Sequence, residues 1–193
     1  NYRLGPLGWF VHPSLNGRDV TAPTLANFGT LDMVEALHWT QRNIAQFGGD
    51  PDNVTIFGES AGGRNVFSLL ASPLTEGLFH RAIAQSGHVR SLTLAEAHNK
   101  GRQFPMVDRG SWEVVQALGF DDENADADGL RAVSTADLLA AYFDLDEDHI
   151  QPAVISDGVV IPEGGLLEAL ADPRYAKNVP VMSGTTRDEV TLW

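Results

Sequence analysis

The apolar residues in the first part of the chain predict a helix followed by two buried strands. Over residues 31–47 they recur at helical spacing, and two glycines and a proline follow where that helix would end. Residues 53–57 are nearly all apolar or β-branched without alternation, as expected for a central parallel strand buried on both faces. Residues 64–71 suit a helix and residues 82–86 a second strand. This order predicts βαβ crossovers and a parallel sheet.

Helical patterns alone fill residues 91–149. Ser111 is positioned to cap a helix over 112–118, and Ser134 begins a capping-box-like start for a second helix. The segment is short and its apolar faces need a partner. We therefore interpret it as an insertion packed over the sheet rather than as an independent domain.

Both ends of the chain return to sheet-like patterns. Residues 1–11 predict the end of a strand that runs into a Gly/Pro turn, and a strand is expected again at 179–183. Asp157-Gly158 predicts a tight turn between two short β pieces. We expect one partial domain, with a sheet core in 1–90, the helical insertion in 91–149 and a return to the sheet in 150–193.

The strand at 53–57 runs directly into Gly58-Glu59-Ser60-Ala61-Gly62, and a helix-compatible segment follows. Gly-x-Ser-x-Gly alone is a common pattern, but between a strand and a helix it indicates a nucleophile elbow. The sharp turn would expose the Ser60 hydroxyl and bring main chains close together, so we expect Gly58 and Gly62 to be required for steric reasons. The Ala61 N–H, at a helix N-terminus, could then bind an oxyanion.

The composition narrows the range of partners. The formal net charge is −13, and residues 121–148 hold ten acids and one base, which indicates a locally acidic, solvated face. Nucleic acids and anionic membranes are therefore unlikely partners on charge grounds. With no cysteine the chain has no disulfide or cysteine metal site, and no apolar run reaches transmembrane length. We expect no metal and no cofactor, and the cellular location is left open.

A serine nucleophile needs a histidine base and an acid that orients it. In folds with this elbow the chain order is serine, acid, histidine, and Asp188 and Glu189 both follow the strand expected at 179–183. All six histidines precede these acids and are out of order: His12, His38, His80, His88, His98 and His149. The residues alone leave Asp188 and Glu189 open, and they predict that the base lies beyond Trp193.

Several stretches together resemble the type-B carboxylesterase (cholinesterase-like) family of α/β-hydrolases. They are Asn1-Tyr2-Arg3-Leu4-Gly5-Pro6-Leu7-Gly8, Asn43-Ile44-Ala45-Gln46-Phe47-Gly48-Gly49-Asp50-Pro51, Phe57-Gly58-Glu59-Ser60-Ala61-Gly62-Gly63 and Ala82-Ile83-Ala84-Gln85-Ser86-Gly87. Residues 152–189 match moderately, and 91–149 only vaguely. The resemblance implies an α/β-hydrolase fold with a mostly parallel sheet and helices on both faces, incomplete at both ends here.

The resemblance also implies roles for individual residues. Ser60 would be the nucleophile, the Ala61 N–H one oxyanion donor and Glu189 the acid of the triad, in preference to Asp188. The family's other oxyanion donors come from a Gly-Gly loop that would precede residue 1, and its histidine would follow residue 193. The chain differs from the family in having Val190 after the Asp-Glu pair and a charged Arg64 after the elbow.

The leading hypothesis is a serine hydrolase that cleaves a small carboxylic ester through an acyl-enzyme intermediate. A non-catalytic adhesion domain usually lacks the nucleophile, which is present here, and an amidase or peptidase on the same fold stays an alternative. We expect the isolated segment to be inactive and Arg3 to pair with Asp32. We also expect Ser60 and Glu189 to lie at one sheet edge, roughly 7–8 Å apart so that one imidazole fits between them.

Overall fold

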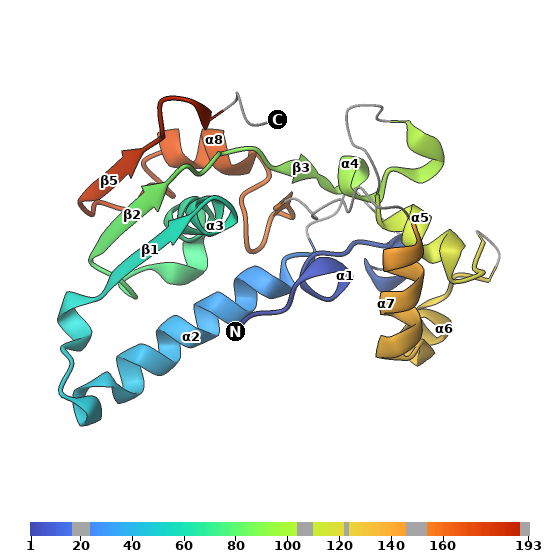
Figure 1. Ribbon diagram of the computed structural model, residues 1–193, viewed down its shortest axis with the longest axis horizontal. Coiled ribbons are helices and arrows are strands. Elements are labelled where there is room, and N and C mark those ends of the chain that lie inside the picture. The colour runs from blue at the N-terminus through green and yellow to red at the C-terminus, as the bar shows by residue number, and fades with distance from the viewer. Residues whose placement is uncertain (17–23, 104–109, 122–123, 146–153, 190–193) are drawn as a thin grey trace.

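The computed structural model of the chain describes residues 1–16, 24–103, 110–121, 124–145 and 154–189 (Figure 1). His149 lies outside these ranges. Short 3-10 turns join several of the main elements. In chain order these elements are α1 (Gly5–Gly8), α2 (Phe28–Asn43), β1 (Thr55–Glu59), α3 (Ala61–Ala71), β2 (Arg81–Gln85), β3 (Leu92–Thr93), α4 (Leu94–His98), α5 (Ser111–Ala117), α6 (Ala127–Ala132), α7 (Thr135–Asp144), β4 (Ile155–Ser156), α8 (Gly165–Ala171) and β5 (Val181–Gly184).

The main sheet has three parallel strands in the order β1-β2-β5. Glu59 pairs with Gln85, and Gln85 pairs with Gly184, so the three strands end level with one another. This confirms the parallel sheet predicted from the alternation of strands and helices. A smaller parallel pair, β3 with β4, continues from the main sheet through the segment after β2 (Figure 1).

One face of the main sheet is covered by α2 and α3. Val34 and Leu37 of α2 pack with three apolar residues of α3 against Ala82 and Ala84, which β2 directs to this side. The opposite face carries a row of side chains in register, Phe57, Ile83 and Met182. Phe57 is 76% exposed and Met182 is 68% exposed, so among the described residues this face is largely uncovered.

The expected ion pair between Arg3 and Asp32 is confirmed. The Arg3 side chain donates to both carboxylate oxygens, at 2.9 Å from Nε and 2.7 Å from Nη2, and the Arg3 N–H donates to the same carboxylate at 2.8 Å. The helix begins at Phe28 rather than near residue 31, so Asp32 lies past its first turn. Because the Arg3 side chain is 50% exposed, the pair contributes on the order of 1 kcal/mol, as surface pairs do.

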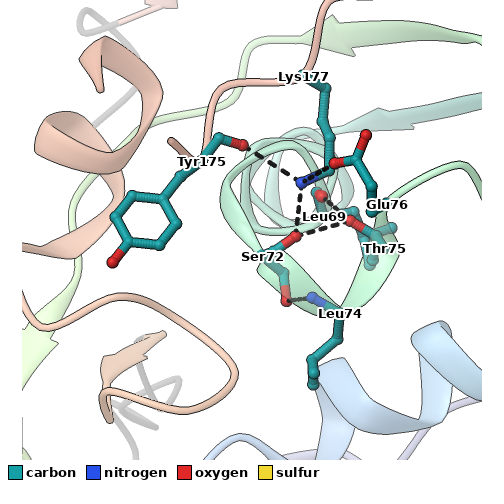
Figure 2. Close-up of polar contacts among 7 residues, drawn as sticks. All are labelled: Leu69, Ser72, Leu74, Thr75, Glu76, Tyr175 and Lys177. Atoms are coloured by element: carbon teal, nitrogen blue, oxygen red, sulfur yellow. Dashed lines mark hydrogen bonds and ion pairs between the residues drawn. The ribbon is translucent and has the colours of Figure 1, made fainter. Parts of the chain in front are cut away.

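A buried lysine marks the C-terminal end of α3 (Figure 2). Lys177 Nζ donates to the carbonyls of Ser72, at 2.8 Å, and Tyr175, at 3.2 Å, and lies 3.3 Å from a carboxylate oxygen of Glu76. A cation here complements the negative end of the helix dipole and satisfies a carbonyl that the helix leaves unpaired. This contact ties the segment before β5 to the elbow helix, and so helps to fix the third strand against the second.

Asp157 forms the polar centre of the C-terminal part. Its side chain is fully buried, and Oδ1 accepts the N–H groups of residues 159, 160 and 161 at 2.8–3.1 Å. Oδ2 accepts from the Asn27 side chain at 2.7 Å and from the Ala26 N–H at 3.2 Å. The chain does turn after Asp157, where the Gly158 N–H donates to the Ile161 carbonyl at 2.8 Å, but only the first of the two expected β pieces, β4, is a strand. The Asp157 carboxylate also holds the segment that enters α2.

Helices α4, α5, α6 and α7 lie beside the sheet, next to α1, rather than over it as expected (Figure 1). Trp9 and Val11 pack with Leu92, Leu94 and Ile155 in a separate apolar cluster, which explains this position. The Ser134 hydroxyl caps α7, as predicted, by accepting the Asp137 N–H.

Two local predictions in these segments are wrong. Ser111 does not cap α5, because its hydroxyl accepts the Val11 N–H at 3.1 Å from a segment distant in sequence. At the N-terminus, where the end of a strand was expected, the Gly/Pro-rich stretch instead forms the helical turn α1.

Candidate active site

Ser60 lies between β1 and α3, in the strand–turn–helix context that the motif predicts. Its main chain has φ 55° and ψ −115°, a region that residues with a side chain rarely occupy. The Ser60 N–H donates to the Gln85 carbonyl at 2.9 Å, which fixes the turn against the end of β2. The serine is exposed. The geometry is that of a nucleophile elbow.

Close main-chain contacts at the elbow explain two glycines, but not the two expected. A Cβ on Gly58 would lie 2.4 Å from the carbonyl carbon of Gly62, and a Cβ on Gly63 would lie 2.7 Å from the Gln85 carbonyl oxygen. A Cβ on Gly62 would meet no atom of the described residues within 4 Å, its own helix backbone excepted. Contrary to the expectation, contacts in this part of the chain therefore do not require a glycine at position 62. The main chain of Gly62 is the group that a side chain on Gly58 would meet. Gly63 is the second position where a side chain would meet main-chain atoms.

The strain at Ser60 leads to a stability prediction. The Ser60→Gly variant should have a free energy of unfolding about 1 kcal/mol higher than that of Ser60→Ala. Glycine adopts a positive φ without steric strain, and this gain exceeds the loss from the greater entropy of its unfolded chain. Both variants lack the hydroxyl, so their difference isolates the main-chain effect. Urea denaturation of the two variants measures it. Equal midpoints, or a more stable alanine variant, would mean that the turn at Ser60 is not strained.

The N-terminal end of α3 supplies a candidate oxyanion donor. Ala61 is the first residue of this helix, and the first intrahelical hydrogen bond runs from the Arg64 N–H to the Ser60 carbonyl at 3.0 Å. The N–H groups of the first turn therefore have no acceptor within the helix, and they point along its positive dipole end. When the Ser60 hydroxyl attacks a carbonyl carbon, the negative charge forms on the carbonyl oxygen of the substrate, and the Ala61 N–H is a candidate donor to that oxygen.

Glu189 follows β5, the third strand of the sheet, at the end where Ser60 follows β1. Hydrogen bonds from the Ser86 side chain and from the Thr186 N–H, which lies 2.9 Å from Oε1, lower the pKa of Glu189 below its usual range. Ser86 follows β2, has φ 51° and donates its N–H to the Gly184 carbonyl at 2.8 Å. Ser60, Ser86 and Glu189 thus follow three neighbouring parallel strands. The expected Ser60–Glu189 separation stays a prediction.

Ser86 is the last residue of the strand expected at 82–86, but its bond to Glu189 was not predicted. The signal that could have found it is the serine directly after a buried strand, in the same place that Ser60 holds one strand away. Asp188 is exposed, next to Glu189, so the two acids differ in position by a single residue. Their separate roles stay a prediction.

Among the described residues, no histidine forms a hydrogen bond with Ser60 or Glu189. His80 lies before β2, at the opposite edge of the sheet, where Nδ1 accepts the Val54 N–H at 3.1 Å. His12 and His98 are buried together against Trp112, and His38 lies on α2. His88 follows Ser86, but its Nδ1 accepts the Arg90 N–H at 3.2 Å. A neutral ring bonded in this way carries its proton on Nε2 and has no lone pair left for a serine.

Two kinds of feature are absent from the described ranges. No three acidic or imidazole side chains gather closely enough there to bind a metal ion. None of the helices in those ranges is both long enough and apolar enough to cross a membrane.

The profile of the "Carboxylesterase family" matches residues 1–193. This chain belongs to the carboxylesterase family. It is 38% identical to the para-nitrobenzyl esterase of Bacillus subtilis over 196 aligned residues, which cover 100% of this chain and 37% of that protein. Over 86 residues, or 45% of this chain and 14% of the relative, it is 57% identical to the human cocaine esterase.

Solved structures of carboxylesterases share the fold. A PNB esterase superposes with a TM-score of 0.78 at 36% identity, covering 97% of this chain and 38% of that chain. A Geobacillus stearothermophilus carboxylesterase gives a TM-score of 0.78 at 33% identity, covering 100% and 38%. The α/β-hydrolase fold expected from the sequence is thereby confirmed. The chain spans about a third of the length of the relatives that it matches along nearly all of its own length, 37% for the Bacillus subtilis enzyme and 32% for the liver carboxylesterase of Sus scrofa.

Proposed function

We propose that this chain is the nucleophile-bearing part of a serine hydrolase that cleaves carboxylic esters through an acyl-enzyme intermediate. The strained elbow carries the proposal. A serine at φ 55° persists only where the surrounding structure enforces it, and here it stands exposed between a parallel strand and a helix N-terminus. Membership of the carboxylesterase family supports the same chemistry.

In this proposal the Ser60 hydroxyl oxygen attacks the ester carbonyl carbon and passes its proton to a histidine from outside residues 1–193. The carbonyl oxygen becomes an oxyanion that the Ala61 N–H binds, together with donors that also lie outside these residues. Collapse of this intermediate expels the alcohol, which takes the proton from the imidazolium. Water then repeats the sequence and releases the acid.

Glu189 has the role of orienting the histidine and stabilising its charged form. The hydrogen bonds from Ser86 and Thr186 favour the ionised carboxylate, because they lower the pKa of Glu189. Its charge is therefore retained as the pH falls through the range in which a histidine titrates. The acid limb of the pH–rate profile should accordingly report the histidine and not Glu189.

An ester hydrolysis assay of the whole polypeptide that carries residues 1–193 tests this function. It should hydrolyse p-nitrophenyl butyrate, and Ser60→Ala should remove the activity while Ser68→Ala, at a buried serine on the same helix, keeps it. An esterase and an amidase share the acyl-enzyme step, so the effect of Ser60→Ala alone does not separate them. The ratio of the turnover rates on the butyrate ester and the matching anilide does. Absence of Ser60-dependent turnover on both would favour a non-catalytic binding domain.

The segment by itself should be inactive. Residues 1–193 should hydrolyse p-nitrophenyl butyrate no faster than the Ser60→Ala control, because among the described residues no histidine forms a hydrogen bond with Ser60. A spectrophotometric assay of the two purified chains measures this. Turnover that depends on Ser60 would mean that one of the six histidines is the base.

A further inference from the structure

One charged side chain beside the elbow has no hydrogen-bond or ion-pair partner in the part of the chain that the structure describes. Arg64 of α3 is only 8% exposed, and its Nε is buried without a hydrogen-bond acceptor in the described part of the chain. No ion pair in those ranges involves it. An isolated charge removed from water in this way is costly unless an anion compensates it.

Arg64 lies one helical turn from the nucleophile, since its N–H donates to the Ser60 carbonyl at 3.0 Å. Side chains on a helix lean toward its N-terminus, which in α3 is the end that carries the elbow. The next residue, Asn65, donates to the Tyr2 hydroxyl at 3.0 Å, which brings the N-terminal segment alongside. The arginine therefore belongs to the surroundings of the candidate active site.

The described residues supply no carboxylate that compensates the charge of Arg64. Burial lowers the pKa of Arg64 and only Tyr2 opposes this, so no described carboxylate contributes. Burial, followed by the charges of Arg64 and Arg90, lowers the pKa of His88. Glu189, the acid at this sheet edge, is instead engaged by Ser86 and Thr186. With the positive end of α3 added, this region favours an anion.

We propose that Arg64 anchors a subsite for a carboxylate on the acyl half of the ester substrate. The inference rests on the proposed function and narrows it to esters that retain a free carboxylate, such as monoesters of dicarboxylic acids. A guanidinium suits this ligand because its planar fork matches the two carboxylate oxygens. We assign the acyl half because it becomes covalently bound to Ser60, one helical turn from Arg64, and so stays near the arginine through both half-reactions.

The kinetic test uses two esters of equal acyl length in the whole polypeptide. Mono-p-nitrophenyl adipate has a terminal carboxylate where p-nitrophenyl hexanoate has a methyl group. Arg64→Met should lower kcat/KM for the adipate about ten- to a hundredfold and leave the hexanoate nearly unchanged, and Arg64→Lys should lie between. Arg90→Met, a nearby cation removed, is the matched control and should keep the ratio of the two substrates. Equal losses on both esters would overturn the proposal.

The binding test needs no turnover and can be made in Ser60→Ala, so it distinguishes failure of the subsite from failure of the proposed function. Histidine labelled at Cε1 reports the pKa of His88, with the signal assigned through His88→Gln. Sodium adipate should raise this pKa relative to sodium chloride at equal ionic strength, because the bound carboxylate offsets the charge of Arg64. The response should vanish in Arg64→Met and persist in Arg90→Met. No response, as when a carboxylate of the polypeptide already fills the site, would overturn the proposal.

Discussion

Replacing Glu189 by glutamine in the whole polypeptide should lower kcat for an aryl ester by roughly three to four orders of magnitude. A carboxylate accepts the Nδ1–H of the histidine, fixes its tautomer and stabilises the imidazolium that forms during attack. Glutamine keeps the size and loses the charge, and its amide can present a donor where an acceptor is needed. Steady-state kinetics with p-nitrophenyl butyrate measure the loss.

Asp188→Asn is the matched control, because it removes one negative charge from the adjacent residue of the same loop. It should change kcat only about twofold, the scale expected of a surface charge. A similar melting temperature for the two variants would separate the catalytic loss from unfolding. If Asp188→Asn were instead the damaging change, the acid of the triad would have to be reassigned and the Glu189 role abandoned.

Asp157→Asn should cost the chain about 4 kcal/mol in free energy of unfolding. The buried carboxylate accepts five hydrogen bonds, three at Oδ1 and two at Oδ2. An amide turns one of these acceptors into a donor that faces other donors, and each buried donor left unpaired costs about 1–3 kcal/mol. Since whole domains are stable by only about 5–15 kcal/mol, the variant should be visibly destabilised.

Chemical denaturation of this variant is compared with Asp128→Asn, the same change at an exposed aspartate. The control should shift the free energy of unfolding by less than about 0.5 kcal/mol. Full stability of Asp157→Asn would mean that the connection between residues 24–27 and 155–161 does not depend on this carboxylate.

Local patterns predicted the features that local forces decide. The apolar run before Gly58 gave the strand, and the strand–turn–helix order around Ser60 gave the elbow, because both are set by neighbouring residues. The expectation that this strand is central and buried on both faces is wrong for the described residues, where β1 is an outer strand and Phe57 is exposed. The capping of α7 by Ser134 follows from residues within one turn. The ion pair of Arg3 with Asp32 spans 29 positions and was inferred with the help of the family resemblance.

The features that the sequence did not predict, or predicted wrongly, depend on contacts between distant segments. Ser111 bonds to Val11, 100 positions away, and that contact replaces the cap that its local context predicts. Asp157 reads as an ordinary turn residue, yet Asn27 lies 130 positions from it and meets its side chain. At the elbow, the choice between Gly62 and Gly63 depends on where the end of β2 lies. None of these distances is encoded in a local pattern.

The uncovered row of Phe57, Ile83 and Met182 bears on how the chain behaves in solution. The row crosses all three strands, and β1 and β5 are the outer strands of the sheet in the described residues. An apolar strip bounded by strand edges invites strand addition and self-association. Association through this strip should therefore limit the solubility of residues 1–193 alone. A low protein concentration should reduce this association, whereas stabilising substitutions in the core should not.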